Sequence, residues 1–95
     1  MPITLRNYGN GQANSMAVDL DYGTSLYFSY ATIVAFTSLD TGLVVSENVW
    51  GSTTGKHLAW IDGGSKEAKA ARLNSLAFQQ ALSAFLIAHN LDGNP

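Results

Sequence analysis

The chain has 95 residues and a formal net charge of −2, and it is 46% hydrophobic, 11% aromatic and 13% charged. A chain of this length buries only a little more than about 60% of its unfolded surface, so we expect residues 1–95 to form a single domain. The charged share is far below the usual value of about 25%, which excludes a disordered chain and indicates that another chain or a ligand covers part of the surface.

The sequence contains no cysteine, which excludes a disulfide framework, a thiolate metal site and a cysteine nucleophile. The acidic net charge argues against duplex nucleic acid as a partner, because nonspecific duplex binding needs many lysines and arginines. Residues 56–72 nevertheless carry a local positive balance. No apolar run reaches the roughly 20 residues of a membrane span and the first residues lack a signal-peptide pattern, so we expect a soluble cytoplasmic protein.

The first fifteen residues are rich in Asn, Gly and Ser, and we expect 1–15 to be a loop-rich start or an edge strand. A clear strand follows, because apolar and aromatic side chains occupy every second position at Met16, Val18, Leu20 and Tyr22. An alternation with a period of two is typical of a strand with one buried face and one wet face.

Three further stretches, at 26–30, 32–39 and 43–50, are alternating or rich in β-branched and aromatic residues. Asp40-Thr41-Gly42 supplies a tight turn before the last of them. Consecutive short strands joined by such turns favour a meander. We therefore expect a small antiparallel sheet of four to five strands across residues 16–62.

The last third of the chain changes its period. Apolar residues fall on one helical stripe at Phe78, Leu82, Phe85 and Leu86, with His89 at its end. This spacing predicts one main helix over 75–89, with a frayed tail at 92–95. The stretch 66–73 has high helix propensity, and whether it is helical stays open.

The helix needs an apolar partner, and the sheet offers the only large one, so we expect an α+β fold in which the sheet packs against one C-terminal helix. The matching periods predict a shared core between the two elements. Its expected members are Met16, Val18, Leu20, Phe28, Val34, Phe78, Leu82 and Phe85.

The densest polar cluster of the chain lies at 50–57. Loop hydroxyls, glycine amides and a cation are the donors that a phosphate or carboxylate needs, which predicts an anion or nucleotide contact. The alternative is a connecting loop whose threonines bond their own backbone. The glycine spacing does not match the phosphate-binding loop of nucleotide triphosphatases. The candidate ligand-binding residues are Thr53, Thr54, Gly55, Lys56 and His57.

The two histidines, His57 and His89, bear on an enzymatic role. His89 is expected to complement the end of the helix dipole. His57 has the ordinary imidazole pKa that suits general acid or base work, but no catalytic partner is identifiable in the sequence. We therefore expect no catalytic residue, no metal ligands and no cofactor.

Tyr27 is out of phase with its neighbour Phe28 on the proposed strand. One ring of the pair must therefore project from the face that does not pack on the helix. An exposed tyrosine is a contact residue for a base, a peptide or a second subunit, so Tyr27 joins the candidate ligand-binding residues.

Two segments, 26–36 and 47–58, resemble a group of small phage-encoded proteins of unknown function. Their shared pattern is a Tyr-Ser-Tyr-x-Thr-x-Val-Ala-Phe strand, an Asn-x-Trp-Ser-x-Thr-Thr-x-Lys/Arg-His segment and a short C-terminal helix. The similarity covers about residues 25–90 and is most specific in the Thr-Thr-Gly-Lys-His portion. Gly51 departs from it, because the group usually has serine there. The resemblance implies an origin in a phage or prophage and names no ligand.

These observations lead to three functional hypotheses. The first is a non-enzymatic phage accessory protein that captures an anionic small molecule, such as a nucleotide, or a host protein in the host cytoplasm; a concave pocket would favour it. The second is a structural or assembly protein, a homo-oligomer with the dimer as default or a virion-associated part; an apolar patch would favour it. The third is a hydrolase or nuclease, which a hydroxyl or carboxylate bonded to His57 would favour.

Overall fold

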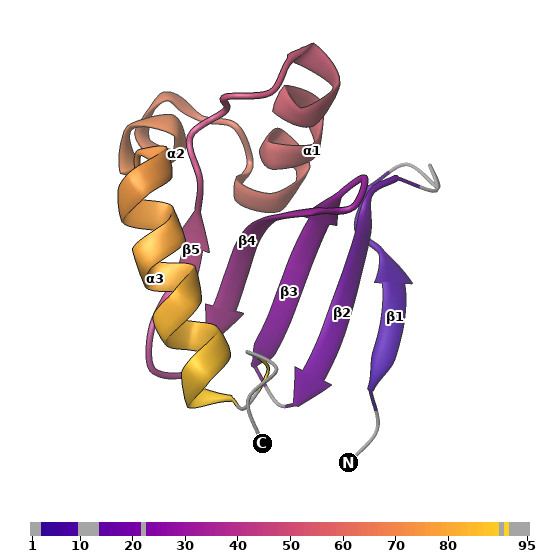
Figure 1. The fold of residues 1–95 in the computed structure, drawn as a ribbon. Coiled ribbons are helices and arrows are strands. Elements are labelled where there is room, and N and C mark those ends of the chain that lie inside the picture. Colours follow the sequence, from indigo (N-terminus) through magenta and orange to yellow (C-terminus); the bar gives the residue numbers. More distant parts are fainter. Residues whose placement is uncertain (1–2, 10–13, 22, 90, 92–95) are drawn as a thin grey trace.

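The computed structural model describes residues 3–9, 14–21, 23–89 and 91. It is an α+β fold in which a five-stranded antiparallel meander precedes the helices, as expected (Figure 1). The strands run in chain order across the sheet, so β1 and β5 are its two edges. The elements are β1 (Thr4–Asn7), β2 (Met16–Asp21), β3 (Thr24–Ser29), β4 (Thr32–Ser38), β5 (Gly42–Val45), α1 (Ser52–Asp62), α2 (Lys66–Ala71) and α3 (Ser75–Ala88).

Helix α3 packs on one face of the sheet. Leu26 of β3 lies opposite Phe36 of β4, and both join the apolar cluster that α3 completes. The helix contributes Phe78, Leu82 and Phe85, all buried as predicted. Its first turn is capped by the side chain of Asn74, and it ends at Ala88, one residue before the expected end.

Helix α1 packs on the opposite face, where it builds a second apolar cluster around Leu58. A bulge in the β3–β4 pairing, at the Tyr27/Phe28 step, places both Val34 and Ala35 in this cluster. Val34 was expected in the core under α3, so that assignment is corrected. Leu20 and Phe28 pack at the edge of the α3 cluster, whereas Met16 and Val18 are only half-buried and belong to neither cluster.

The prediction of sheet and loop up to residue 62 is wrong for its last part, because the sheet ends at Val45 and 52–62 form α1. The sequence of α1 begins Ser-Thr-Thr-Gly, which has low helix propensity. Its buried side chains, Thr54, His57 and Leu58, hold it against the sheet instead, and such tertiary packing overrides weak propensity.

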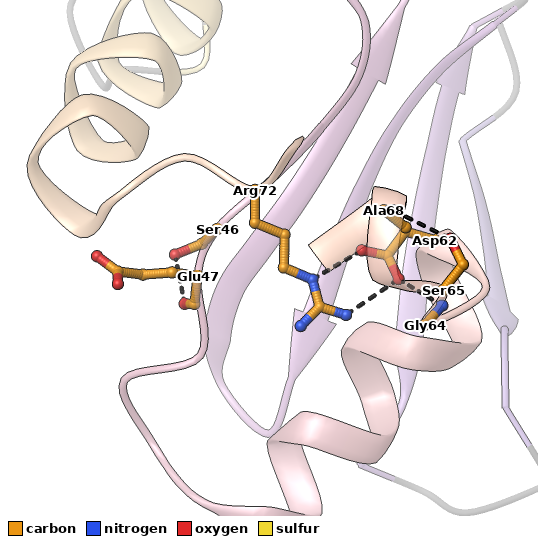
Figure 2. Close-up of polar contacts among 7 residues, drawn as sticks. All are labelled: Ser46, Glu47, Asp62, Gly64, Ser65, Ala68 and Arg72. Atoms are coloured by element: carbon orange, nitrogen blue, oxygen red, sulfur yellow. Dashed lines mark hydrogen bonds and ion pairs between the residues drawn. The ribbon is translucent and has the colours of Figure 1, made fainter. Parts of the chain in front are cut away.

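The chain between α1 and α3 is fixed by a buried ion pair and by the short helix α2 (Figure 2). The stretch 66–73, whose conformation the sequence left open, is therefore helical from Lys66 to Ala71. The Arg72 guanidinium donates two hydrogen bonds to the Asp62 carboxylate at 2.8 and 3.0 Å, and both side chains are less than a tenth exposed. Leu73 then pairs with the end of β5 through two backbone hydrogen bonds. These contacts fix the carboxyl end of α1, whose amino end is free to line a site.

Candidate functional site

A pocket of about 320 Å³ lies where the β3–β4 turn meets the amino end of α1. Five of its nine described lining residues are serine or threonine, and two aromatic side chains stand beside them. Its lining residues are Ser29, Tyr30, Thr32, Val34, Trp50, Gly51, Ser52, Thr53 and Thr54. None of these side chains carries a charge at neutral pH, so the pocket acts through hydrogen bonds, helix dipole and ring contacts.

The amino end of α1 enters this pocket without a side-chain cap. Gly51 occupies the N-cap position, and its lack of a side chain leaves the first-turn amides without the acceptor that serine or aspartate supplies there. The Asn48 side chain orders the preceding turn, because it accepts from the amides of Trp50 and Gly51 and donates to the Gly51 carbonyl. Uncapped first-turn amides favour an anion.

A chain of three hydrogen-bonded side chains borders the pocket. The Ser29 hydroxyl, at the end of β3, lies 3.0 Å from the Thr54 hydroxyl and 2.6 Å from Nδ1 of His57. His57 is fully buried, and its Nε2 has no hydrogen-bond partner among the described residues. Burial lowers the pKa of the His57 imidazole, so the ring is neutral at neutral pH.

Three aromatic rings surround the imidazole of His57. Trp60 stacks on it at 5.5 Å between ring centroids, Tyr8 meets it edge-on at 6.3 Å, and Tyr30 lies tilted at 5.9 Å. The hydroxyl of Tyr8 donates to the Phe28 carbonyl, so it is already used. His57 thus has one polar contact, on the pocket side, and an apolar surrounding elsewhere.

Tyr30 has an unusual backbone conformation for a bulky residue. Its φ is 57°, in the left-handed region that glycine and asparagine occupy most easily. Its amide donates to the Asn14 carbonyl at 2.9 Å, which holds the turn, while its side chain is 55% exposed and lines the pocket. Strain of this kind, worth about 1–2 kcal/mol, tends to gather at functional sites.

The model of a family of unknown function, DUF8033, matches residues 3–77. The chain belongs to this family. No curated protein matches the chain, and no solved structure does. The DUF8033 region contains all five strands, α1 and α2 and the first residues of α3, so every residue that lines the pocket lies within it.

Within the DUF8033 region, the structure divides the residues that the sequence singled out at 53–57. Thr53 and Thr54 line the pocket. Lys56 is exposed while His57 is buried, because consecutive helical side chains point about 100° apart. The two therefore share no surface, and His57 reaches the pocket only through Ser29. Gly55 lies against Asn48, whose amide nitrogen would be 3.0 Å from an added Cβ.

Tyr27 lies apart from the pocket. Its ring packs edge-on against Tyr8 with centroids 5.4 Å apart, and the Arg6 guanidinium covers it at 5.5 Å. Arg6 also pairs with Asp19 at 2.7 Å, which raises the pKa of the arginine and lowers that of the Asp19 carboxyl. Tyr27 is half-buried in this cluster rather than projecting as the free contact that the sequence predicted.

Several lining residues escaped the sequence analysis as site residues. Ser29 and Tyr30 fall in the stretch 26–30 that the sequence predicted as a strand, where alternation signals packing alone. The structure ends β3 at Ser29 and places Tyr30 in the following turn, whose positive φ the sequence does not indicate. Trp50 and Ser52 belong to the polar cluster at 50–57, so that cluster was the available signal for them. Of the side chains around His57, Trp60 lies one turn further along α1, whereas Tyr8, Ser29 and Tyr30 come from distant parts of the chain, and no local pattern reports those three.

The described residues set limits on other chemistry. Among them, no group of three His, Asp or Glu side chains could hold a metal ion, and no helix is long and apolar enough to cross a membrane. The Ser29–His57 contact is the hydroxyl contact that the hydrolase hypothesis requires. An activated serine also needs its base oriented by a third group, and the described structure offers none at Nε2.

Proposed function

We propose that this chain is a non-enzymatic binding module that captures a small anionic molecule with a flat ring, of which a nucleotide is the leading example. The observation that carries the proposal is the pocket at the amino end of α1, where uncapped first-turn amides and a wall of hydroxyls meet two aromatic side chains. In this proposal the anion contacts the first turn of α1, including Thr53 and Thr54, and does not contact Lys56 or His57.

The polar half of the pocket suits an oxyanion. Ser52, Thr53 and Thr54 bring their amides and their hydroxyls to one place at the positive end of the helix dipole. None of the described residues that line the pocket is a carboxylate. A second cavity, of about 350 Å³ between α3 and the β4–β5 turn, has a mainly apolar lining that includes Asp40 as well as His89. The Asp40 carboxylate disfavours an anion there.

The aromatic half suits a planar group. Trp50 is 42% exposed and Tyr30 is 55% exposed, and both line the pocket. Flat rings stack on aromatic side chains with a favourable energy of about 1–3 kcal/mol per base. A volume of about 320 Å³ lies at the small end of the range for ligand sites, roughly 300–1,000 Å³, and matches a mononucleotide better than a polymer.

The biological setting of the proposal rests on the phage-like segments at 26–36 and 47–58, which contain all the described residues that line the pocket. In this setting the protein acts in the cytoplasm of an infected host cell and removes a nucleotide signal from use. Capture of a host protein is the other outcome of the same hypothesis. In that case substitutions on the surface around α1, rather than in the pocket, should weaken binding of the host protein.

Titration followed by isothermal calorimetry tests the proposal. Adenosine monophosphate, ribose 5-phosphate and adenosine separate the anionic contact from the ring contact. We expect the nucleotide to bind most tightly and each fragment to bind at least tenfold more weakly. Trp50→Ala should lower the affinity for the nucleotide to that for ribose 5-phosphate. An unchanged near-ultraviolet circular dichroism signal from the remaining aromatic residues, including the buried Phe78, would show that the fold is intact. No binding of the nucleotide, or equal affinities for the nucleotide and its two fragments, would refute the proposal.

A second candidate function, a homo-oligomeric assembly or virion part, is favoured by the edge strand β1. Leu5 in β1 and Ile3 just before it are 66% and 70% exposed, and among the described residues β1 pairs only with β2. An exposed apolar edge is a template for pairing with another chain. Sedimentation equilibrium tests it: a dimer that Leu5→Lys converts to a monomer supports assembly, and a wild-type monomer at high concentration removes it.

A further inference from the structure

We infer that His57 is a positioning residue for the pocket: an oxyanion bound at Thr54 selects the tautomer of His57 that carries its proton on Nδ1. This inference rests on the proposed function, because it needs an anion in the pocket. It assigns a role to the fully buried imidazole, which touches no ligand directly. The carrier of the effect is the hydrogen-bonded chain from Thr54 through Ser29 to His57.

The direction in which the hydrogen bonds from His57 through Ser29 to Thr54 are donated depends on one proton. Each hydroxyl has a single hydrogen to donate. If Nδ1 carries the proton, it donates to Ser29, Ser29 donates to Thr54, and the Thr54 hydrogen is free for the pocket. If Nδ1 is bare, Ser29 must donate to it at 2.6 Å, and Thr54 can then donate back to Ser29 at 3.0 Å. In that state Thr54 can donate to an anion only by giving up its hydrogen bond to Ser29.

The other ring nitrogen of His57 does not decide between these states. Nε2 is buried and has no hydrogen-bond partner in the described part of the chain, so neither a proton nor a lone pair gains a hydrogen bond there. The aromatic rings of Tyr8, Tyr30 and Trp60 surround the imidazole. The balance between the tautomers is therefore set at Nδ1, and through it by the occupant of the pocket.

An oxyanion supplies the bias that the empty pocket lacks. Thr54 lines the pocket beside the first-turn amides of α1, and a hydrogen bond to a charged acceptor is stronger than one between neutral groups. Donation from Thr54 to the anion costs the Thr54–Ser29 hydrogen bond when Nδ1 is bare and leaves that bond intact when Nδ1 carries the proton, so binding and tautomer are linked. Because one neutral hydrogen bond makes the difference, we expect saturation with an oxyanion to change the tautomer ratio of His57 by up to about tenfold. A ligand that only donates would favour the opposite tautomer.

Nitrogen NMR of the full chain, labelled at its histidines and backbone amides, tests the inference with inorganic phosphate as the probe. The amide signals of Ser52–Thr54 report whether phosphate occupies the pocket. The ring nitrogens of His57 report which one carries the proton, and the exposed His89 serves as the internal reference. We expect the amides to shift and the Nδ1 signal of His57 to move to the protonated type while Nε2 stays unprotonated.

The outcomes separate the two proposals. The inference would be overturned if the amides shift while the His57 tautomer stays unchanged, while Nε2 becomes protonated, or while both ring nitrogens become protonated. Each of these results would still support phosphate binding in the pocket. An absence of amide shifts at saturating phosphate would overturn both. Ser29→Ala removes the middle of the chain: phosphate should still shift the amides, but the His57 signals should no longer follow. Coupling that survives in this variant would also overturn the inference.

Discussion

Replacing Gly51 by aspartate should stabilise the protein and abolish anion binding at the same time. The added side chain has room, because nothing lies within 4 Å of a Cβ at this position, and the φ of 169° is extended backbone open to any residue. Aspartate at the N-cap accepts from the first-turn amides of α1. The carboxylate thus takes the donors that we assign to the ligand and adds a negative charge beside them.

The size of the stabilisation follows from three contributions. A capping carboxylate in place of glycine gains a few tenths of a kcal/mol, its charge at the helix dipole gains about 0.3–1, and the loss of glycine's freedom in the unfolded chain gains about 0.4–1. We expect about 1–2 kcal/mol in total. For a domain of this size each kcal/mol raises the melting temperature by about 4–8 °C.

Thermal melting and phosphate titration of the same samples measure both effects. Gly51→Asn is the matched control, because it caps the helix without the charge: it should stabilise less and weaken phosphate binding less. The combination of higher stability and at least tenfold weaker binding cannot arise from misfolding. Unchanged phosphate affinity in Gly51→Asp, or a lower melting temperature, would show that the amino end of α1 is not the site.

Four other predictions concern the turn, the core, the ion pair and pH. Tyr30→Gly should leave stability within about 1 kcal/mol, because relief of the positive φ offsets lost contacts, and calorimetry should show weaker nucleotide binding with phosphate binding retained; a loss of both would contradict it. Phe85→Ala should lower the free energy of unfolding by about 3–5 kcal/mol in urea titrations, and a loss below about 1 would place that ring outside the core. Arg72→Ala should cost a similar ~3–5 kcal/mol, because it leaves the Asp62 carboxylate buried and unpaired; a double variant with Asp62→Asn should recover part of it, and additive losses would argue against the pairing. Since burial lowers the pKa of His57, the folded state takes up fewer protons than the unfolded one, so the urea midpoint should fall as pH decreases below about 6.5, and a flat midpoint between pH 7.5 and 5.5 would contradict this.

The sheet and α3 were predictable because their periods are visible in apolar residues. The stripe through Phe78, Leu82 and Phe85 marks the buried face of α3. The alternation from Met16 located β2, although Met16 and Val18 themselves are only half-buried. Helix α1 has a helical spacing too, because its inward positions include Thr54, His57, Leu58 and the partly buried Ile61. Two of these four are polar, so a search for apolar periodicity sees half of the stripe and misses the helix.

The candidate site was only partly predictable, for a different reason. The polar cluster at 50–57 marked the right segment, since Thr53 and Thr54 line the pocket. Their neighbours in space come from β3, because Ser29 lies 25 residues before Thr54 and 28 before His57. Which members of the cluster face inward depends on the helical conformation, which the sequence did not reveal. Lys56 and His57 were therefore grouped although the helix separates them.

Two departures from local rules meet at the same pocket, and this coincidence argues that the pocket is used. A tyrosine occupies a left-handed position at 30 where glycine would be relaxed, and a glycine occupies the N-cap at 51 where a polar side chain would stabilise α1. The glycine lowers stability by an amount that one substitution would recover, and the tyrosine holds a strained backbone conformation. Each also has a consequence for binding, since the tyrosine places a ring at the pocket and the glycine leaves the helix amides open. Local sacrifices of stability that converge on one cavity are the pattern expected of a functional site.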